Sequence, residues 1–254
     1  SSGFLGKELC KLLKRNYTIK KLNLRNIQIF NQEKLHRVFK IICENDIIIN
    51  CATSLRPKTK EDYWINCNLS FLLLKYIQKN KINCRLIHIS TTDVLIKNLN
   101  DRYTISKRFA EKKIKNLDCL ILRLPLLYKK YYYENQSSKL IFYNYLSIKF
   151  PIYPMFYPGA VYQPLKINTV SVFINSIIKK RKKKGVFNLV GSKKYSTWDI
   201  FYKIAKLKNK KPFKLNTKIL SIFFPNFLLN NSRIILQLSS VDQTMIKKKI
   251  ILKS

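Results

Sequence analysis

Few residues in this chain can bind a metal ion, and few can interrupt regular structure. Two histidines, and six cysteines without a CxxC pair, argue against a structural zinc site, so we expect no metal. Five glycines and eight prolines exclude fibrous and low-complexity architectures. No apolar run approaches the ~20 residues of a membrane-spanning helix. The best run, residues 219–229, has 11 residues and contains Pro225, so we expect no membrane span.

Acidic residues are also scarce, which gives the chain an extreme charge. It holds 13 Asp and Glu against 50 Lys and Arg, a formal net charge of +37. Such a charge is typical of proteins that bind phosphates. The basic residues, however, are spread along the whole chain. Ile, Asn and Tyr are also abundant, and an A/T-rich coding sequence would give this composition. We therefore predict no specific nucleic-acid partner, and we interpret the clusters at 179–184 and 247–249 as solvated loops.

The apolar content nevertheless predicts a folded protein. Hydrophobic residues make up 46% of the 254 residues and aromatic residues 13%, which excludes a disordered chain. This length suits one large domain, or a domain with a smaller cap, and can bury a sizeable core. The cysteines are scattered on apolar segments, and we interpret them as reduced thiols of a cytoplasmic protein.

Helical and strand patterns alternate from the start of the chain to about residue 125. Helical patterns cover residues 7–15, 32–43, 61–79 and 101–115, and strand patterns cover residues 17–24, 47–51, 84–90 and 117–124. Continuous apolar runs such as IIINC at 47–51 are typical of parallel strands that are buried on both faces. The alternation predicts an α/β protein with a doubly wound, Rossmann-like parallel sheet.

The periodicity breaks after Pro125. Residues 128–164 are rich in Tyr, Phe and Pro, which indicates a capping or substrate-facing region of short helices and loops. One more strand is predicted at 186–190, followed by a helix over 197–207 with Ser196 or Thr197 as its N-cap. We therefore predict a Rossmann-like domain over residues 1–127 and a smaller C-terminal region over 128–254, with 186–207 returning to the core.

Two glycines mark the entry to the first helix. The segment Gly3-Phe4-Leu5-Gly6 fits the last two glycines of a GxxGxxG dinucleotide-binding loop. Gly3 would let the backbone approach a pyrophosphate, and Gly6 would let the helix pack closely on the sheet. The N-terminus of the helix supplies unpaired N–H groups and a partial positive charge for the phosphates. The first glycine and the preceding strand are absent from the chain, so an ordinary loop before a helix remains the alternative.

A tyrosine and a lysine share one face of the helix predicted over 101–115. Tyr103 and Lys107 are four residues apart, so the ammonium group can lie beside the phenol. A free phenol has a pKa of ~10, and lowering it by about 3 units takes roughly 4 kcal/mol, which a lysine and an oxidised nicotinamide could supply. Tyr17/Lys21, Tyr145/Lys149 and Tyr202/Lys206 repeat the spacing by chance. Tyr103 differs because it follows a strand that ends in Ser90-Thr91-Thr92, and strand ends are where open α/β sheets bind ligands.

The order of these segments resembles the extended short-chain dehydrogenase/reductase family, which comprises NAD-dependent epimerases, dehydratases and reductases of nucleotide sugars. The similarity includes its dTDP-4-dehydrorhamnose reductase-like members. The matching segments are SGFLG at 2–6, IINCA at 48–52, HISTTDV at 88–94, YTISKRFAEK at 103–112, LRLPLLY at 122–128 and VFNLVGS at 186–192. The resemblance covers about residues 1–210. It lacks the family's first strand, so we expect either an N-terminally truncated chain or a strand upstream.

The resemblance implies a set of catalytic residues. Thr91 would hydrogen-bond the reacting oxygen, Tyr103 would act as general acid and base, and Lys107 would lower the tyrosine pKa and hold the nicotinamide ribose. Asn66 matches a structural or active-site asparagine. The implied cofactor-binding residues are Gly3, Phe4, Leu5, Gly6, Asn23, Arg25, Cys51, Ala52, Tyr103 and Lys107. The implied cofactor is NAD or NADP. The lack of an acid near Asn23 and Arg25, where one would hold the ribose of NAD, leans towards NADP.

The resemblance also implies the reaction and its partners. We expect hydride transfer to or from a nucleoside-diphosphate sugar by an NAD(P)-dependent epimerase, dehydratase or reductase. The 1–127 domain would bind NAD(P) and the 128–254 region the sugar nucleotide, and a homodimer is an open option. The alternative is a non-catalytic, dinucleotide-binding structural subunit of the same fold. His88 and Trp64 are interpreted as packing residues.

Overall fold

The computed structural model describes residues 3–22, 31–55, 57–97, 99–129, 152–157, 160–180, 184–207, 209–216 and 249–252. The chain divides into two compact units. The first comprises Ser1–Val94, Asn100–Leu124 and Ile167–Leu189, and the second comprises Leu95–Leu99, Pro125–Lys166 and Val190–Ser254. The division into domains 1–127 and 128–254 stays a prediction.

A parallel sheet forms the centre of the first unit. Its strands are β1 (Ile47–Asn50), β2 (Arg85–Thr91), β3 (Cys119–Leu124) and β8 (Gly185–Gly191), and the full strand order is β1-β2-β3-β8-β11, with β11 at Lys249–Leu252. The β1–β2, β2–β3 and β3–β8 pairs are all parallel. The side chains of β2 and β3 are mostly buried, as expected for strands covered on both faces. The predicted α/β, Rossmann-like sheet is confirmed.

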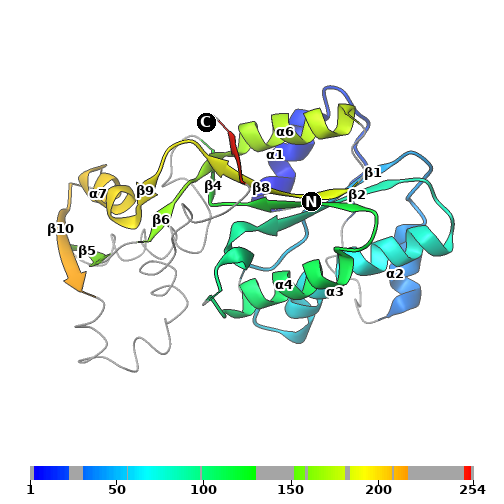
Figure 1. Ribbon diagram of the computed structural model, residues 1–254, viewed down its shortest axis with the longest axis horizontal. Helices are drawn as coiled ribbons and strands as arrows, with labels where there is room; N and C mark the ends of the chain where they lie inside the picture. Colours follow the sequence, from blue (N-terminus) through cyan, green and yellow to red (C-terminus); the bar gives the residue numbers. More distant parts are fainter. Residues whose placement is uncertain are drawn as a thin grey trace. The chain divides into compact units, whose positions relative to one another are not determined.

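Helices cover both faces of this sheet (Figure 1). One face carries α1 (Phe4–Leu13) and α6 (Ile167–Lys179), and the other carries α2 (Gln32–Phe39), α3 (Lys60–Lys79) and α4 (Arg102–Ile114). Side-chain caps fix the start of α2 and α3: Asn31 accepts from the backbone of Lys34, and Thr59 and Asp62 form a capping box. None of the described helices is long and apolar enough to cross a membrane.

A core cluster of buried apolar residues joins α2, α3 and α4 to the sheet. It contains Leu35, Phe39, Ile42, Leu69, Leu73, Leu74, Leu86, Ile114, Cys119 and Ile121. Trp64 is half-buried and packs against this cluster, and His88 is 2% exposed on β2. All six cysteines are free thiols, and only Cys43 is exposed.

The strand predicted over 17–24 is wrong for the part that the structure describes. Residues 17–22 follow α1 without strand hydrogen bonds to any described strand. The Tyr17 hydroxyl instead donates to Asn175 Oδ1 of α6 at 3.0 Å. A strand is stable only when a neighbouring strand pairs with it, so an alternating pattern by itself does not make one.

The second unit contains short paired strands and one helix. β4 (Leu127–Tyr128) pairs with β7 (Leu165–Lys166), β5 (Ile152–Tyr157) with β10 (Lys211–Asn216), and β6 (Val161–Tyr162) with β9 (Tyr195–Ser196). Short helices and loops were expected over 128–164. The described residues there form strands and the loops beside them, whereas residues 130–151 and 158–159 lie outside the described residues. The predicted helix is α7 (Thr197–Leu207).

The N-cap of α7 is Ser196 rather than Thr197. Its hydroxyl accepts from the backbone N–H of Asp199 at 3.0 Å, and the Asp199 carboxylate accepts from the backbone N–H of Ser196 at 2.9 Å. This reciprocal pair satisfies two backbone donors at the start of the helix. The sequence left the two positions open, and the structure resolves the choice.

Gly191 lies where two backbone segments of the second unit approach each other closely. Its N–H donates to Gln163 O at 2.9 Å, and a Cβ there would lie 2.1 Å from Pro164 O. Because the clash is with backbone, we expect Gly191→Ala to lower the free energy of unfolding by about 3 kcal/mol. Urea denaturation measures this change. Ser192→Ala, on the exposed neighbouring side chain, should change stability by less than ~0.5 kcal/mol, and equal effects would contradict the prediction.

Candidate active site

The cap of α4 places Tyr103 in the first turn of that helix. The Asp101 carboxylate accepts from the backbone N–H groups of Tyr103 at 3.0 Å and Thr104 at 3.1 Å. It also accepts from the Thr104 hydroxyl at 2.6 Å. These three bonds fix where the helix begins, and therefore fix the position of Lys107 one turn later.

Lys107 connects α4 to the central strand β2. Its side chain is buried, with the residue 2% exposed, and Nζ donates to Ile89 O at 3.0 Å. β2 ends two residues later, at Thr91. Tyr103 is half-buried and lies one helical turn before Lys107. The structure thus brings Lys107 to the strand end that carries Thr91, with Tyr103 preceding it on α4.

Thr91 is positioned by the short 3-10 helix η1 (Thr92–Leu95) that follows the strand. The residue is 7% exposed, and its Oγ1 accepts from the Asp93 N–H at 3.2 Å. This bond uses a lone pair of the hydroxyl oxygen and does not use its O–H donor. The arrangement is compatible with the predicted donation to a substrate oxygen.

Asn66 of α3 joins the loop after β1 to α4. Its Oδ1 accepts from the Thr53 hydroxyl at 2.9 Å and the Ser54 N–H at 2.8 Å. Its Nδ2 donates to Ser54 O at 2.9 Å and to the Ser106 hydroxyl at 3.1 Å. Both polar groups of this buried amide therefore bond within the protein. This favours a structural role for Asn66 over the active-site role, the two roles that the resemblance implies.

Sequence reasoning missed an ion pair between α4 and β3. The Glu111 carboxylate accepts from the Ser90 hydroxyl at 2.5 Å and from Arg123 Nε at 3.0 Å, and it also bonds Arg123 Nη2. Arg123 Nη1 donates to Asn188 Oδ1 on β8 at 3.2 Å. This network ties the helix of Tyr103 and Lys107 to three strands. Two signals were present: a lone arginine inside an apolar strand, and a glutamate one turn after Lys107.

A second buried network surrounds His88. Asn50 Nδ2 donates to the Ser70 hydroxyl at 2.7 Å, and that hydroxyl lies 2.7 Å from His88 Nδ1. Asn50 Oδ1 accepts from the Ala52 N–H at 3.0 Å and so shapes the turn after β1. Burial, with the nearby Lys107 charge, lowers the pKa of His88 well below its ordinary value. We therefore interpret His88 as a neutral residue of the core, without a role in proton transfer.

The start of α1 fits the phosphates of a dinucleotide. Gly3 is its N-cap and provides no side-chain cap, and the first turn carries no acidic residue. Apart from its chain neighbours, no atom of the described residues lies within 4 Å of the point that a Cβ on Gly3 would occupy, whereas Gly6 is buried against the protein. The N–H groups of the first turn are thus not capped by the Gly3 side, where a phosphate could approach the backbone.

The other predicted cofactor residues are placed as follows. Phe4 and Leu5 are half-buried in the first turn of α1, and Cys51 and Ala52 are half-buried directly after β1. Asn23 and Arg25 lie outside the described residues. The structure thus places the predicted residues that it describes on α1, on α4 and at the ends of β1 and β2.

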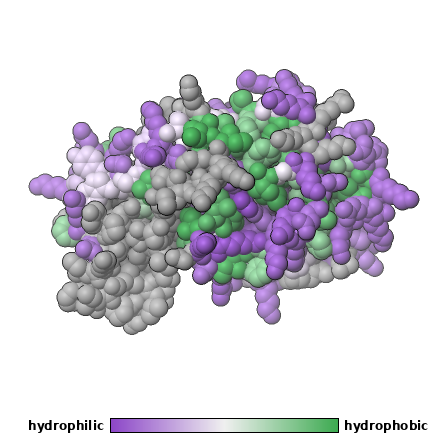
Figure 2. Space-filling view, in the orientation of Figure 1, coloured by the Kyte–Doolittle hydropathy of each residue, from purple (hydrophilic) through white to green (hydrophobic). Residues whose placement is uncertain are grey.

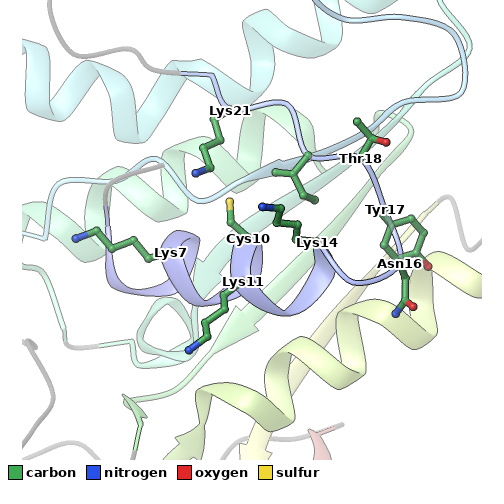
Figure 3. Close-up of a pocket in the computed structure, with 9 residues that line it drawn as sticks. Lys7, Cys10, Lys11, Lys14, Asn16, Tyr17, Thr18 and Lys21 are labelled. Carbon is green, nitrogen blue, oxygen red and sulfur yellow. The ribbon is translucent and has the colours of Figure 1, made fainter.

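A basic hollow of about 820 Å³ lies along α1 and the segment after it (Figure 3). Its lining includes four lysines at positions 7, 11, 14 and 21. Cys10, Lys14 and Lys21 point into the space between the helix and residues 18–21, and Lys11 points away from it. The positive potential of these side chains attracts anions towards this part of the molecule.

Burial makes Lys107 easier to deprotonate than an ordinary lysine. Loss of hydration lowers its pKa to about 8, although the nearby Cys51, Glu111 and Cys67 act in the opposite direction. Burial likewise raises the pKa of the Cys51 thiol to about 12, so this thiol stays neutral beside the ammonium. A strongly shifted lysine on a helix that also carries a tyrosine is typical of a functional site.

This pKa shift predicts an unusual pH dependence of stability. The folded protein binds the Lys107 proton with a pKa of about 8, and the unfolded chain with a value near 10.5. Between these values the unfolded state binds more protons, so the Lys107 contribution raises the free energy of unfolding by about 3 kcal/mol as pH rises. Lys107→Met should lack this rise in urea titrations from pH 7 to pH 10.5.

The comparison with the variant is necessary because buried thiols act in the opposite sense. Burial raises the pKa values of Cys84 and Cys119 to about 11, so their contribution to stability falls as pH rises above 9. Both thiols remain in Lys107→Met. The difference between the two proteins therefore reports Lys107 together with its charge effect on the Cys51 and Cys67 thiols, and a difference that is constant with pH would refute the shift.

The sequence model of the NAD dependent epimerase/dehydratase family matches residues 1–149. The chain belongs to this family. Membership confirms the predicted family and the predicted cofactor, NAD or NADP. It also confirms the prediction that the chain comes from a family of NAD(P)-dependent enzymes. No curated protein matches the sequence of this family member.

Solved structures of similar fold belong to several enzymes. A dTDP-4-dehydrorhamnose reductase from Yersinia enterocolitica is 16% identical with a TM-score of 0.68, covering 99% of this chain and 92% of that chain. The reductase from Bacillus anthracis, in complex with NADP, is 21% identical with a TM-score of 0.64, covering 84% and 80%. The dTDP-glucose 4,6-dehydratase of the same organism, with NAD, is 20% identical with a TM-score of 0.62, covering 85% and 82%. At these identities the likeness shows the fold.

Proposed function

We propose that this family member is an NAD(P)-dependent reductase, epimerase or dehydratase of a nucleoside-diphosphate sugar, with Tyr103, Lys107 and Thr91 as its catalytic residues. The observation that carries the proposal is the bond from the buried Lys107 ammonium to Ile89 O at 3.0 Å. It anchors the helix of Tyr103 beside the carboxyl end of β2, the edge at which open α/β sheets bind their ligands.

Each of the three residues has a distinct task in proton transfer: Tyr103 and Thr91 act on the substrate oxygen, and Lys107 acts on Tyr103. The Tyr103 hydroxyl gives a proton to this oxygen when the attached carbon is reduced, and takes it back in the reverse direction. The Lys107 ammonium stabilises the phenolate form of Tyr103 by its charge. The Thr91 hydroxyl donates a hydrogen bond to the same oxygen and so polarises the bond to carbon.

The start of α1 and Lys107 would hold the dinucleotide. The first-turn N–H groups after Gly3 would bind its phosphates, and Lys107 would hold the ribose next to the nicotinamide. When bound, the dinucleotide supplies or accepts the hydride. The half-buried Cys51 and Ala52 would line the adenosine side. Whether the cofactor is NAD or NADP in this chain is decided by binding measurements with each.

The substrate class follows from the family and from charge. The similar structures named above include enzymes of dTDP-linked sugars, and this chain carries a formal net charge of +37, which favours a diphosphate group. We assign the sugar nucleotide to the 128–254 region because residues 128–164 are rich in Tyr and Phe, whose rings can stack on a base or a sugar. This assignment extends the predicted domain division.

The test is turnover by the full chain with each of NAD⁺, NADP⁺, NADH and NADPH and a panel of nucleoside-diphosphate sugars, because a reductase needs a hydride donor whereas an epimerase or a dehydratase needs a hydride acceptor. Loss of reduced-nicotinamide absorbance reports a reductase, whereas NMR of the recovered sugar reports inversion or loss of water without net oxidation. We expect conversion that requires both the dinucleotide and the sugar nucleotide. Tight dinucleotide binding without conversion of any sugar would instead support the non-catalytic structural subunit.

A further inference from the structure

Arg108 of α4 fastens the stretch of chain between Thr91 and Tyr103. Figure 2 shows a mostly hydrophilic surface over α4, where a basic side chain is ordinarily solvated. Arg108 is instead half-buried. Its Nε donates to Val94 O at 3.0 Å, and its Nη1 donates to Asn100 Oδ1 at 3.1 Å. One side chain thus bonds the chain soon after β2 ends and again just before α4 begins.

The two bonded residues mark where the chain leaves the first unit and where it returns. Val94 is the last residue of the first unit before Leu95–Leu99, which are grouped with the second unit, and Asn100 is the first residue after them. A guanidinium is planar and holds its donors in a fixed geometry, so two acceptors bonded to it do not move independently. Arg108 therefore holds both ends of this excursion on the side of the first unit.

The bond to Val94 reaches Thr91 through the 3-10 helix η1. Val94 follows Asp93, whose N–H donates to Thr91 Oγ1 at 3.2 Å. That bond occupies a lone pair of the hydroxyl oxygen and leaves the O–H donor for a substrate. Arg108 and Tyr103 belong to the same helix. The bond to Val94 O thus ties the turn that orients the Thr91 hydroxyl to the helix that carries the phenol.

We propose that Arg108 is a positioning residue, which holds η1 against α4 so that the Thr91 and Tyr103 hydroxyls meet at one substrate oxygen. This inference rests on the proposed function. A misplacement of about 1 Å between reacting groups can lower a rate about 10²-fold, so a bond that fixes η1 has a large effect on catalysis. Val94 O and Asn100 Oδ1 are neutral acceptors, so these two bonds fix geometry without neutralising charge.

The competing role for an arginine on this helix is purely electrostatic. The Arg108 charge would then favour the phenolate form of Tyr103 directly, as any nearby cation does. Such an effect does not involve the Thr91 hydroxyl. A substitution of Thr91 therefore separates the two roles.

The test is the single-turnover rate constant of the full chain, with the dinucleotide bound and the protein in excess over a nucleoside-diphosphate sugar that the natural chain converts. Chemical quenching followed by analysis of the sugar measures it for any of the proposed reactions. Loss of folded protein lowers the amplitude of this reaction and leaves its rate constant unchanged. We expect Arg108→Met to lower the rate constant about 10- to 100-fold. Asn100→Ala should lower it less, because the bond to Val94 O remains.

A double-variant cycle shows through which group Arg108 acts. In Thr91→Val the hydroxyl that Arg108 positions is absent, so adding Arg108→Met should lower the rate constant by less than threefold. A fall of the full size in the Thr91→Val background would overturn the proposal, because the Arg108 charge would then act on Tyr103 directly.

Arg85→Met is the matched control. Arg85 is also half-buried and donates to a backbone carbonyl, Ile178 O, at 3.4 Å, but it begins β2 and so lies at the opposite end of that strand from Thr91. Its rate constant should stay within threefold of the natural chain. An equal fall in Arg85→Met, or no fall in Arg108→Met, would refute the positioning role alone. If the natural chain converts no sugar, the proposed function fails first and this role fails with it.

Discussion

Replacing Tyr103 with phenylalanine is expected to lower kcat of sugar conversion by about 10²- to 10⁴-fold, the usual contribution of a general acid or base. The substitution removes only the phenol oxygen. The backbone N–H that bonds Asp101 stays, so the start of α4 is preserved. Dinucleotide affinity should remain within about threefold, because the phosphates are bound at α1. Steady-state kinetics and a separate dinucleotide titration measure the two quantities.

Tyr202→Phe provides the matched control. Tyr202 precedes Lys206 on α7 by the same four residues, and it is 49% exposed. It therefore repeats the spacing of the Tyr103 pair on a helix that does not pack against β2, and its removal should leave kcat unchanged. If Tyr103→Phe kept a rate within threefold of the natural chain, the proton would have to be moved by another group, and the catalytic assignment would be withdrawn.

Much of the first unit could be predicted because its strands have strong local patterns. The apolar run CLILRL predicted a buried strand, and the structure places β3 (Cys119–Leu124) in the middle of the sheet. The long amphipathic pattern over 61–79 likewise predicted α3 to within one residue. In both cases local propensity, periodicity and burial agree, which is when sequence reasoning succeeds.

Features that depend on distant partners could not be predicted in this way. Residues 17–22 carry a strand pattern, but no described strand pairs with them. The hydrogen bond of Asn66 to Ser106 depends on how α3 lies against α4, which no local pattern encodes. The predicted spacing of Tyr103 and Lys107 was local, whereas the bond of Lys107 to Ile89 O depends on the packing of α4 against β2.

Glu111→Gln is expected to lower the free energy of unfolding by about 3 kcal/mol, because it leaves the Arg123 charge without its counter-ion. The side chains of Glu111 and Arg123 are 8% and 19% exposed, so water can compensate only in part. Arg123→Met should have a similar cost. The pair Lys184 and Asp118 is the matched control: it spans 3.9 Å on the surface, and Asp118→Asn should change stability by less than ~0.5 kcal/mol.

A double variant distinguishes lost pairing from lost packing. Glu111→Leu combined with Arg123→Met removes both charges, so it should cost less than the sum of the single substitutions in urea denaturation. Additive effects would show that the two charges do not stabilise each other.

Glu111 also raises the pKa of Lys107, so Glu111→Gln should lower that pKa and shift the alkaline limb of any Lys107-dependent activity towards lower pH. Asp118→Asn should not move this limb, because no charge effect of Asp118 on Lys107 is found.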